Sequence, residues 1–323
     1  MLNDKNNINH SVKDIQNNLL DWFSLHGRYW IPWKLKKDGS LPKIGEKISP
    51  YQIWIAEVML QQTQIKVVLP YWKNWINSFP TLLDVAEADL QTILLQWQGL
   101  GYYSRAKRIH QSSKLLINVI GKSNVLEPSC WPIELCFWIS LPGIGRSTAG
   151  SIISSAFDLP TPILDGNVKR ILSRLLANKI PPLKDQKRLW TISNKLISKD
   201  RPRDFNQALM DLGAKVCTIN NPLCPSCPLK KNCLSYLYYD PIDFPKKNMR
   251  KIIPIQEIGI GLVFNNKGEL LIDQRLENSS MGGMWEFPGG KKEPDESIKE
   301  TIKREIIEEL GIVVNVGNQL LSF

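Results

Sequence analysis

Two stretches in the middle of the chain set its architecture, Leu141-Pro-Gly-Ile-Gly145 and Ile163-Leu-Asp-Gly-Asn-Val-Lys-Arg170. Gly143 and Gly145 allow the backbone to turn sharply between two helix-like segments. They also expose N–H groups at the start of the second segment, where a phosphate can bind. A tight turn between packed helices explains these glycines equally well. Asp165 precedes a helical run, and taken alone it is best explained as a helix N-cap.

The residues around these stretches predict an all-α domain. An amphipathic helix is expected over residues 15–29, followed by a loop from Lys34 to Ser49. From Pro50 to about Ser235, short helix-like segments alternate with Pro and Gly, and no alternating β pattern precedes residue 250. The stretch Thr81–Asp84 resembles a capping box, which marks the start of a helix.

The sequence pattern changes after a linker that contains Pro and several basic residues. Residues 257–264 and 269–274 flank the turn Asn265-Asn-Lys-Gly268, and this arrangement predicts a β-hairpin. A helix is expected around residues 297–310. The tail is therefore expected to have an α/β fold.

Charge follows the same division of the chain. The predicted parts are a helical domain at residues 1–237, a linker at 238–251 and an α/β domain at 252–323. Residues 1–249 carry 32 Lys and Arg against 19 Asp and Glu, whereas residues 250–323 carry 9 against 12. A basic front half beside a mildly acidic tail indicates that the front half binds a polyanion, although a merely basic surface would look the same.

Two features of the sequence argue against a membrane or secreted protein. No apolar run approaches the roughly 20 residues that a transmembrane helix needs. The polar stretch Met1–Asn18 lacks the apolar core of a secretory signal. We expect a soluble intracellular protein, cytoplasmic and with no membrane contact, in which cysteines stay reduced and a tight cysteine cluster binds metal.

The cysteine spacing C-x6-C-x2-C-x5-C is formed by Cys217, Cys224, Cys227 and Cys233. Four thiolates within 17 residues can close around one metal centre, and four unrelated buried cysteines are improbable at this density. Zinc and a 4Fe–4S cluster both accept four thiolates, so the number of ligands does not identify the metal. Cys130 and Cys136 lie elsewhere and are expected to be ordinary core residues.

The most family-specific segment is Pro50-Tyr-Gln-Ile-Trp-Ile-Ala-Glu-Val-Met-Leu-Gln-Gln-Thr-Gln64. It resembles the adenine DNA glycosylases. The cysteine spacing and the glycine hairpin followed by Asp165 resemble the wider superfamily that includes endonuclease III. The resemblance implies a mostly α, helix–hairpin–helix DNA glycosylase domain in which the loop at residues 217–233 holds one structural 4Fe–4S cluster.

The resemblance implies two catalytic carboxyl groups, Glu57 as general acid and Asp165 as the ionised partner. Excision requires a proton on the departing base and a negative charge beside the positive sugar, so the two environments should separate the two pKa values. The neighbours Trp54 and Ile55 favour the neutral form of Glu57. Related enzymes that also cut the DNA backbone have a nucleophilic lysine where this chain has Ser147, which favours a monofunctional enzyme that uses water.

Further positions are implied to contact DNA or the substrate base. Gln61, Gln62 and Thr63 lie at the helix end that enters the base stack. Leu100 and Tyr102 form the wedge that fills the space left by an extruded base. The complete set of implied contacts is Arg28, Trp33, Gln61, Gln62, Thr63, Leu100, Tyr102, Gly143, Gly145, Ser147, Asn167 and Lys169. The chain departs from the family at Lys34, where Arg or Gln is commoner, and in a longer connection from Trp33 to Pro50.

The tail contains a complete Nudix box, G-x5-E-x7-R-E-U-x-E-E-x-G-U, which begins at Gly290. Glutamates of such a box bind Mg²⁺ against a diphosphate, so Glu305, Glu308 and Glu309 are candidate magnesium ligands. In adenine glycosylases a Nudix-like domain, usually with a degraded box, reads 8-oxoguanine opposite the target adenine. The sequence stops at Phe323, so we expect an incomplete Nudix-like domain, either in a fragment or in a shortened tail.

These features predict a monomeric, monofunctional DNA glycosylase. Its substrate is expected to be double-stranded DNA in which adenine is mispaired with 8-oxoguanine or guanine. Three alternatives remain open at this point: an endonuclease III-like glycosylase/lyase, a Nudix nucleotide hydrolase fused to a DNA-binding module, and an inactive iron–sulfur protein that binds DNA.

Overall fold

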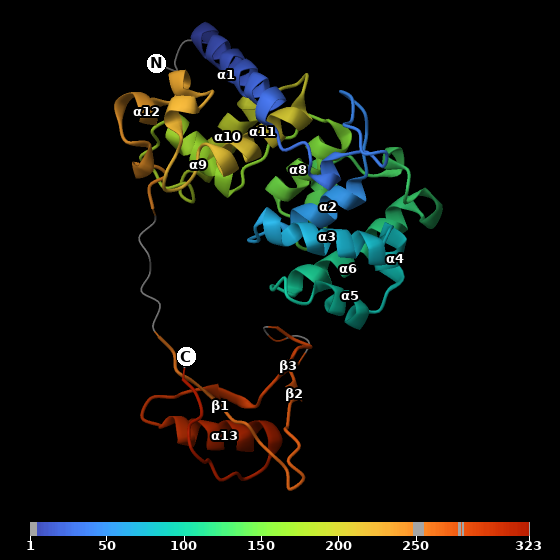
Figure 1. Ribbon diagram of the computed structural model, residues 1–323, viewed down its shortest axis with the longest axis vertical. Coiled ribbons are helices and arrows are strands. Elements are labelled where there is room, and N and C mark those ends of the chain that lie inside the picture. The colour runs from blue at the N-terminus through green and yellow to red at the C-terminus, as the bar shows by residue number, and fades with distance from the viewer. Residues whose placement is uncertain (1–4, 248–254, 277–278, 280, 323) are drawn as a thin grey trace. The chain divides into compact units, whose positions relative to one another are not determined.

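The computed structural model describes residues 5–247, 255–276, 279 and 281–322. The chain divides into two compact units, Met1–Asn248 and Met249–Phe323 (Figure 1). Within residues 5–247 the structure contains helices and turns and no strand. Among the described residues, no helix combines the length and apolar character that a membrane crossing requires.

The α-helices of the first unit are mostly short, as the Pro and Gly spacing predicted. They are α1 (Lys5–His26), α2 (Pro50–Met59), α3 (Ile65–Ser78), α4 (Leu82–Glu87), α5 (Leu90–Trp97), α6 (Ser104–Ile120), α7 (Leu135–Ser140), α8 (Arg146–Phe157), α9 (Gly166–Leu175), α10 (Gln186–Leu196), α11 (Pro202–Lys215) and α12 (Leu234–Tyr238). Short 3₁₀ turns are η1 (Pro32–Lys34), η2 (Lys122–Asn124), η3 (Pro128–Cys130), η4 (Cys224–Ser226), η5 (Lys230–Asn232) and η6 (Pro241–Asp243).

Local capping explains where several helices begin. Ser49 accepts a hydrogen bond from the Gln52 N–H, and Pro50 occupies the first turn of α2, where its missing N–H costs nothing. The expected capping box is present at α4, with Thr81 and Asp84 bonded reciprocally. Helix α1 begins ten residues earlier than residue 15, because no Gly or Pro interrupts the preceding stretch.

Two hydrophobic cores lie within the first unit. One is built from residues between Ile31 and Phe157 and includes the fully buried Trp54, Trp75 and Trp97. The other joins α1 to α9, α10 and α11. Helix α8 packs against α2 and also against α11, so the two cores meet along α8 (Figure 1). Residues on α2 and at the start of α9 are thereby brought to one junction.

The described residues of the second unit form two short antiparallel sheets and one helix. Its elements are β1 (Ile258–Ile260), β2 (Asp273–Gln274), β3 (Trp285–Glu286), β4 (Gly289–Lys291) and α13 (Ile298–Leu310). Strand β1 pairs with β4, and β2 pairs with β3. Helix α13 packs on β1 and β4, and Ser297 and Glu300 form a capping box at its start.

The expected hairpin at residues 257–274 forms only near its turn. The Leu271 N–H donates to the Val263 carbonyl, and Phe264 and Leu270 form an isolated antiparallel bridge. Away from this turn the prediction of paired strands is wrong, because β1 and β2 each pair with a later segment. Hairpin rules consider only neighbouring residues and cannot anticipate these later partners.

Candidate active site

Glu57 lies on α2 where this helix packs against α8. The hydroxyl of Ser151 donates a hydrogen bond of 2.8 Å to Oε1 of Glu57. Removal of water around the carboxyl raises the pKa of Glu57 to about 7, the Ser151 hydrogen bond lowers it, and the charge of Asp165 raises it. Trp54 and Ile55, the neighbours from which an apolar environment was expected, are both fully buried.

Asp165 is the N-cap of α9, the simpler interpretation that its sequence context allowed. Its Oδ1 accepts a hydrogen bond of 2.8 Å from the Val168 N–H. Burial raises the pKa of Asp165, whereas the Val168 N–H and the charges of Arg170 and Lys169 lower it. The environments therefore raise both carboxyl pKa values, but Asp165 has more contacts that favour its ionised form than Glu57 has.

A buried ionic cluster that the sequence did not predict lies beside this pair. Asp211 on α11 has no exposed side-chain surface and accepts hydrogen bonds of 2.7 Å from both N and Nε of Arg28. The ammonium of Lys34 is 3.6 Å from Oδ2 of Asp211 and has no hydrogen-bond partner. Burial lowers the pKa of Lys34 to about 8, and the Lys34 charge lowers the pKa of Glu57. The only sequence signal was a lone acid in the apolar run Ala208–Gly213.

Two other implied contacts of the substrate region lie in the core. Trp33 is buried, and its ring lies 5.3 Å from that of Trp72. Leu100 is buried in the same core, so it does not project as the expected wedge. Tyr102 does project, with 62% of its surface exposed. Leu100 and Tyr102 therefore differ in exposure, because the turn between them buries the Leu100 side chain and leaves the Tyr102 side chain exposed.

The glycine hairpin is joined to the segments that carry the two candidate carboxyl groups, Glu57 and Asp165. Gly143 has a left-handed φ of 80°, and a side chain there would contact Arg108. The amide of Gln61 donates long hydrogen bonds of 3.4 Å to the Gly143 carbonyl and 3.5 Å to Thr148. Ser147 accepts a hydrogen bond of 3.0 Å from the Leu164 N–H, next to Asp165. The Ser147 hydroxyl therefore makes a contact to the backbone next to Asp165.

An arginine connects the Asp165 turn to the cysteine loop. Arg170 donates to the side chain of Asn167 and to the carbonyl groups of Gly213 and Cys217, each at 2.8 Å. Asn167 is half-buried and packs against Gly213, where an added methyl group would clash with it. Lys169 is half-buried one turn into α9.

The four cysteines of the spacing line one pocket between α9, α11 and α12. They are Cys217, Cys224, Cys227 and Cys233. Arg174 donates a hydrogen bond of 3.4 Å from Nη1 to Sγ of Cys217, and burial raises the pKa of the Cys227 thiol to about 12. None of the chain's six cysteines forms a disulfide. Among the described residues, no group of three or more His, Cys, Asp or Glu side chains is already drawn together in metal-binding geometry, but four soft donors around one pocket suit a metal centre.

Cys130 and Cys136 were expected to be core residues, and this expectation is wrong. Both side chains are exposed. Cys130 ends η3 and Cys136 lies in the first turn of α7, and the nearby Trp131 and Trp138 occupy the core instead. Large aromatic side chains bury more apolar surface than a thiol does, so the tryptophans determine which face points inward.

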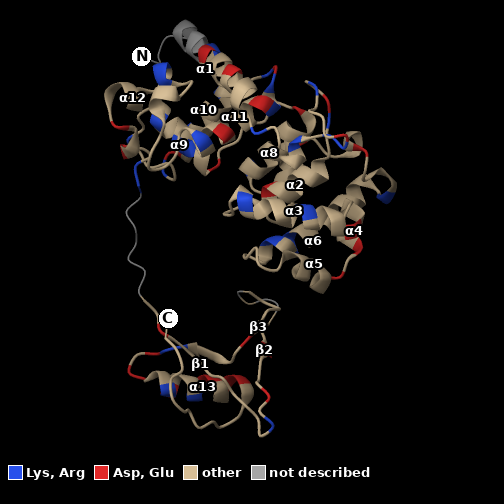
Figure 2. Ribbon diagram, viewed as in Figure 1, with Lys and Arg blue, Asp and Glu red and all other residues tan. Residues whose placement is uncertain are grey.

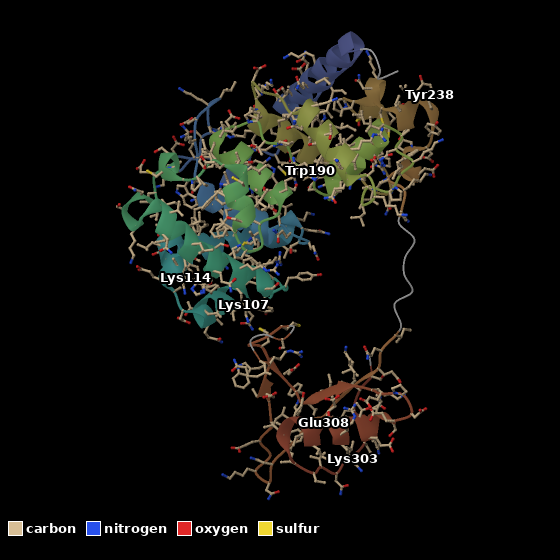
Figure 3. The ribbon with its side chains drawn as sticks, turned by 180° about the vertical axis from the view of Figure 1, so that it is seen from behind. Lys107, Lys114, Trp190, Tyr238, Lys303 and Glu308 are labelled. Atoms are coloured by element: carbon tan, nitrogen blue, oxygen red, sulfur yellow. The ribbon has the colours of Figure 1, made fainter. Side chains whose placement is uncertain are left out.

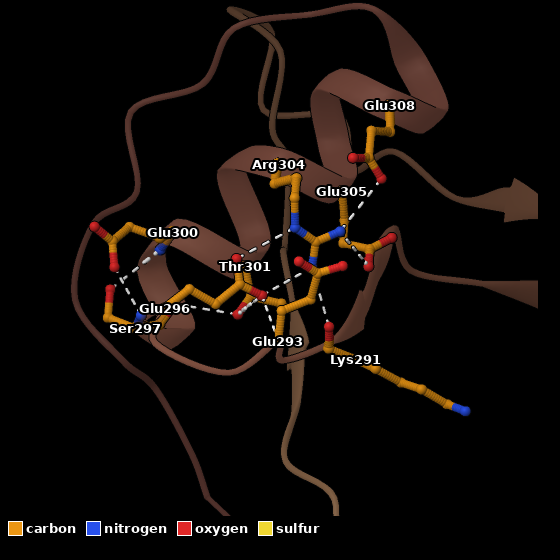
Figure 4. Close-up of polar contacts among 9 residues, drawn as sticks. All are labelled: Lys291, Glu293, Glu296, Ser297, Glu300, Thr301, Arg304, Glu305 and Glu308. Carbon is orange, nitrogen blue, oxygen red and sulfur yellow. Dashed lines mark hydrogen bonds and ion pairs between the residues drawn. The ribbon is translucent and has the colours of Figure 1, made fainter.

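Arg304 is the centre of the polar contacts in the Nudix box (Figure 4). It forms ion pairs with Glu296 at 2.8 Å, Glu305 at 2.9 Å and Glu308 at 3.2 Å. Gly290 allows this arrangement, because a Cβ atom there would lie 2.1 Å from the Glu305 carboxyl. Two of the three candidate magnesium ligands are thus bound to a guanidinium, and burial raises the pKa of the third, Glu309.

Basic side chains occur on several helices of the first unit, including α6 and α9 (Figure 2). Figure 3 shows Lys107 and Lys114 on α6 and Trp190 on α10. Trp190 stacks under Arg146, whose guanidinium carbon is 4.2 Å from the ring centre. This contact ties the first turn of α8 to α10, across the junction of the two cores.

Comparisons with known proteins agree with this architecture. A family model of HhH-GPD superfamily base excision DNA repair proteins matches residues 55–195, and a NUDIX domain model matches residues 259–322. A solved thermostable thymine-DNA glycosylase is similar to the chain, with a TM-score of 0.57 and 22% identity over 71% of this chain and 98% of that one. The first unit therefore has the fold of a helix–hairpin–helix base excision glycosylase.

Curated relatives define the family more narrowly. An adenine DNA glycosylase of Buchnera aphidicola subsp. Schizaphis graminum is 36% identical, over 84% of this chain and 73% of the relative. The one of Buchnera aphidicola subsp. Baizongia pistaciae is 39% identical, over 84% of this chain and 72% of the relative. The chain belongs to the adenine DNA glycosylase family.

Proposed function

We propose that this chain removes adenine mispaired with 8-oxoguanine or guanine from double-stranded DNA. The observation that carries the proposal is the junction of α2, α8 and α9, where Glu57 is half-buried and bonded to Ser151 within electrostatic reach of Asp165. A pKa of about 7 lets Glu57 be protonated and still release a proton near neutral pH. The names of the relatives support adenine in DNA as the substrate, and the basic first unit supports binding to DNA.

The proposed reaction is a hydrolysis with defined proton movements. Neutral Glu57 gives its proton to the departing adenine, most usefully at N7. The bond between the sugar carbon C1′ and the base then breaks, and its electron pair stays on adenine. The carboxylate of Asp165 stabilises the positive sugar. A water oxygen then bonds to C1′, and the proton that this water loses restores neutral Glu57.

We propose that the chain is monofunctional and leaves the DNA backbone intact. Ser147 has no amine, and its hydroxyl accepts a hydrogen bond from Leu164. Lys169 supplies the amine nearest in sequence to Asp165. Borohydride treatment during turnover should therefore trap little protein on DNA. Strong trapping that survives Lys169→Ala would instead support the endonuclease III-like glycosylase/lyase.

We propose that the four pocket cysteines hold one 4Fe–4S cluster. The support is the donor set, since four thiols share a pocket and Arg174 donates to one sulfur. Bound there, the cluster would cross-link the loop at residues 217–233 and hold it against α9 and α11. Iron and acid-labile sulfide analysis of the purified protein tests this proposal. Four iron atoms per chain support it, and stoichiometric zinc without sulfide contradicts it.

The tail is proposed to serve lesion recognition rather than nucleotide hydrolysis. Glu305 and Glu308 are paired with Arg304, which leaves less negative charge for a magnesium ion. Binding of Mg²⁺ by Glu305, Glu308 and Glu309, recognition of 8-oxoguanine, association with cellular DNA and a monomeric state all stay predictions. Hydrolysis of 8-oxo-dGTP that requires Mg²⁺ and is lost in Glu308→Gln would support the Nudix alternative.

Single-turnover kinetics on a duplex with one adenine opposite 8-oxoguanine test the main proposal. The intact chain should release adenine, and both Glu57→Gln and Asp165→Asn should reduce the rate at least about 100-fold, as expected for loss of an acid or an electrostatic group. Binding of the duplex without adenine release by the intact chain would favour the inactive DNA-binding alternative. Release that both variants retain would reject the assigned roles.

A further inference from the structure

Arg105 is a buried cation in the first turn of α6. Only 5% of its surface is exposed. Its guanidinium forms no ion pair with a carboxylate among the described residues, although burial of a charge is costly without compensation. It donates instead to backbone carbonyl groups and one hydroxyl. The position of these acceptors in the fold indicates the role of the Arg105 guanidinium.

The acceptors belong to two segments that are about 40 residues apart in sequence. Nη1 donates to Met59, the last residue of α2, at 2.9 Å and to Gln61, in the loop that follows α2, at 2.6 Å. Nη2 donates to Leu100 and Gly101, each at 3.1 Å, on the loop between α5 and α6. We call residues 60–64 and 98–103 the two stacking loops, because they carry the side chains expected to enter the DNA. One guanidinium therefore bridges both.

Each stacking loop contains a residue in the left-handed backbone region. Gln62 has a φ of 61° and Tyr102 a φ of 49°. Such values are unfavourable for residues with side chains and persist only where the surroundings enforce them. The carbonyl groups that Arg105 binds at Gln61 and Gly101 immediately precede these two residues. Arg105 thus fixes the peptide unit on which each unfavourable conformation depends.

Aromatic contacts extend this arrangement to an exposed side chain. The guanidinium carbon of Arg105 lies 5.2 Å from the ring centre of buried Trp97 and 5.5 Å from that of exposed Tyr102. The indole N–H of Trp97 also donates to the Gly101 carbonyl at 3.0 Å. The Tyr102 ring is therefore attached to the core through Arg105, although most of its own surface faces solvent.

We propose that Arg105 is a positioning residue that joins the two stacking loops into one rigid element, which enters duplex DNA as the target adenine leaves the stack. This inference rests on the proposed function. Extrusion of a base leaves a space that the protein must fill, and two independent loops would each lose conformational freedom on entry. Lysine cannot replace Arg105, because a single ammonium lacks the planar fork of donors that reaches both sets of carbonyl groups.

The test compares Arg105→Lys with the unmodified chain by stopped-flow fluorescence. The duplex carries 2-aminopurine next to an adenine opposite 8-oxoguanine, and adenine release is measured in the same single-turnover reaction. Base extrusion unstacks the probe and raises its fluorescence before the glycosidic bond breaks. We expect Arg105→Lys to slow the fluorescence rise about tenfold, a typical effect of about 1.4 kcal/mol on a barrier. Binding of duplex at saturation should be retained.

Arg203→Lys is the matched control for an effect on folding alone. Arg203 is also buried and also donates to carbonyl groups, at Ser155 and Glu46, where it fastens the loop before α2 to the end of α8. It contacts neither stacking loop. We expect this variant to melt at a lower temperature and yet to extrude the base at the unmodified rate.

The outcomes separate this inference from the proposed function. Extrusion at the unmodified rate in Arg105→Lys would overturn the inference, and so would equal slowing in both variants in proportion to their lost melting temperature. Either result leaves the proposed function intact, because the unmodified chain still releases adenine. If the unmodified chain neither raises the fluorescence nor releases adenine, the proposed function fails and the inference fails with it.

Discussion

The two carboxyl groups of the site differ in what compensates their burial. Glu57 has one hydroxyl donor, Ser151, and the charge of Lys34, whereas Asp165 has a backbone N–H and two basic neighbours. Fewer partners leave the neutral form of Glu57 favoured, and more partners support the ionised form of Asp165. Two groups of the same kind, both carboxyls, can therefore serve at one junction as proton donor and as stabilising charge, because their environments differ.

Removal of the Ser151 hydroxyl tests this explanation for Glu57. The rate of adenine release should fall as the pH rises through about 7 in the unmodified chain, because ionised Glu57 has no proton to donate. The Ser151 hydrogen bond lowers the pKa of Glu57, so Ser151→Ala should move this descending limb to higher pH. Single-turnover rates between pH 5 and 9 measure the shift. Ser113→Ala removes another buried hydroxyl, on α6, and should leave the limb in place.

The same pKa predicts how the stability of the protein depends on pH. Folding raises the pKa of Glu57 from 4.5 to about 7, so the folded state binds this proton more tightly. Stability from this group is fully present below pH 4.5 and is lost as the pH rises through about 7. Glu57→Gln cannot ionise and should raise the melting temperature at pH 8 by roughly 2 to 4 °C. Its effect at pH 5 should be smaller, and an equal gain at both pH values would contradict the explanation.

At the scale of single elements, the start of α9 has a structural and a proposed catalytic task. Asp165 caps the helix through the Val168 N–H, and its carboxylate is also the proposed sugar stabiliser. Both tasks use the same carboxylate. A simple loss of activity on mutation would therefore not show which task had been removed.

Two substitutions at Asp165 separate the tasks. Asparagine caps helices about as well as aspartate but carries no charge, so Asp165→Asn should lose activity and keep its stability within roughly 0.5 kcal/mol. Asp165→Ala should lose activity and about 1 kcal/mol as well. Urea unfolding and single-turnover kinetics measure the two quantities. Equal destabilisation by both substitutions would show that the carboxylate charge, rather than the cap, stabilises this turn.

The sequence predicted those parts of the site that short stretches determine. The apolar surroundings of Glu57, the turn at Gly143 and the cap at Asp165 depend on adjacent residues. Ser151 and Asp211 were not predicted, because they reach the site only when helices distant in sequence pack together. The individual roles of the candidate site residues stay predictions.

The same limit applied to whole elements of the fold. The α-helices of the first unit follow from the helical periodicity and the Pro and Gly spacing, and the capping boxes at α4 and α13 mark starts that local residues encode. The pairing of β1 with β4 depends on segments about 30 residues apart, and turn chemistry near residue 265 favours a competing local hairpin. Tertiary contacts favour the β1–β4 pairing over the local hairpin, and a local sequence pattern contains no information about such contacts.

At the scale of the whole molecule, the two units carry charges of opposite sign. The excess of Lys and Arg is confined to residues 1–249, and residues 250–323 are slightly acidic. We therefore expect phosphate contacts from the first unit, and the lesion recognition proposed for the tail would rest on contacts to the base. Phosphate contacts raise affinity for every sequence equally, and base contacts discriminate between sequences.

This division predicts different salt dependences for affinity and for discrimination. A surface that contacts about six phosphates should lose roughly a thousandfold in affinity between 50 and 200 mM salt, because bound counterions are released. The ratio of affinities for adenine opposite 8-oxoguanine and adenine opposite guanine should change little over that range, since base contacts release few ions. Fluorescence anisotropy of both duplexes with the Glu57→Gln chain, which retains its substrate, measures the two quantities together. A ratio that falls as steeply as the affinity would mean that the charge of the first unit also determines which mispair is bound.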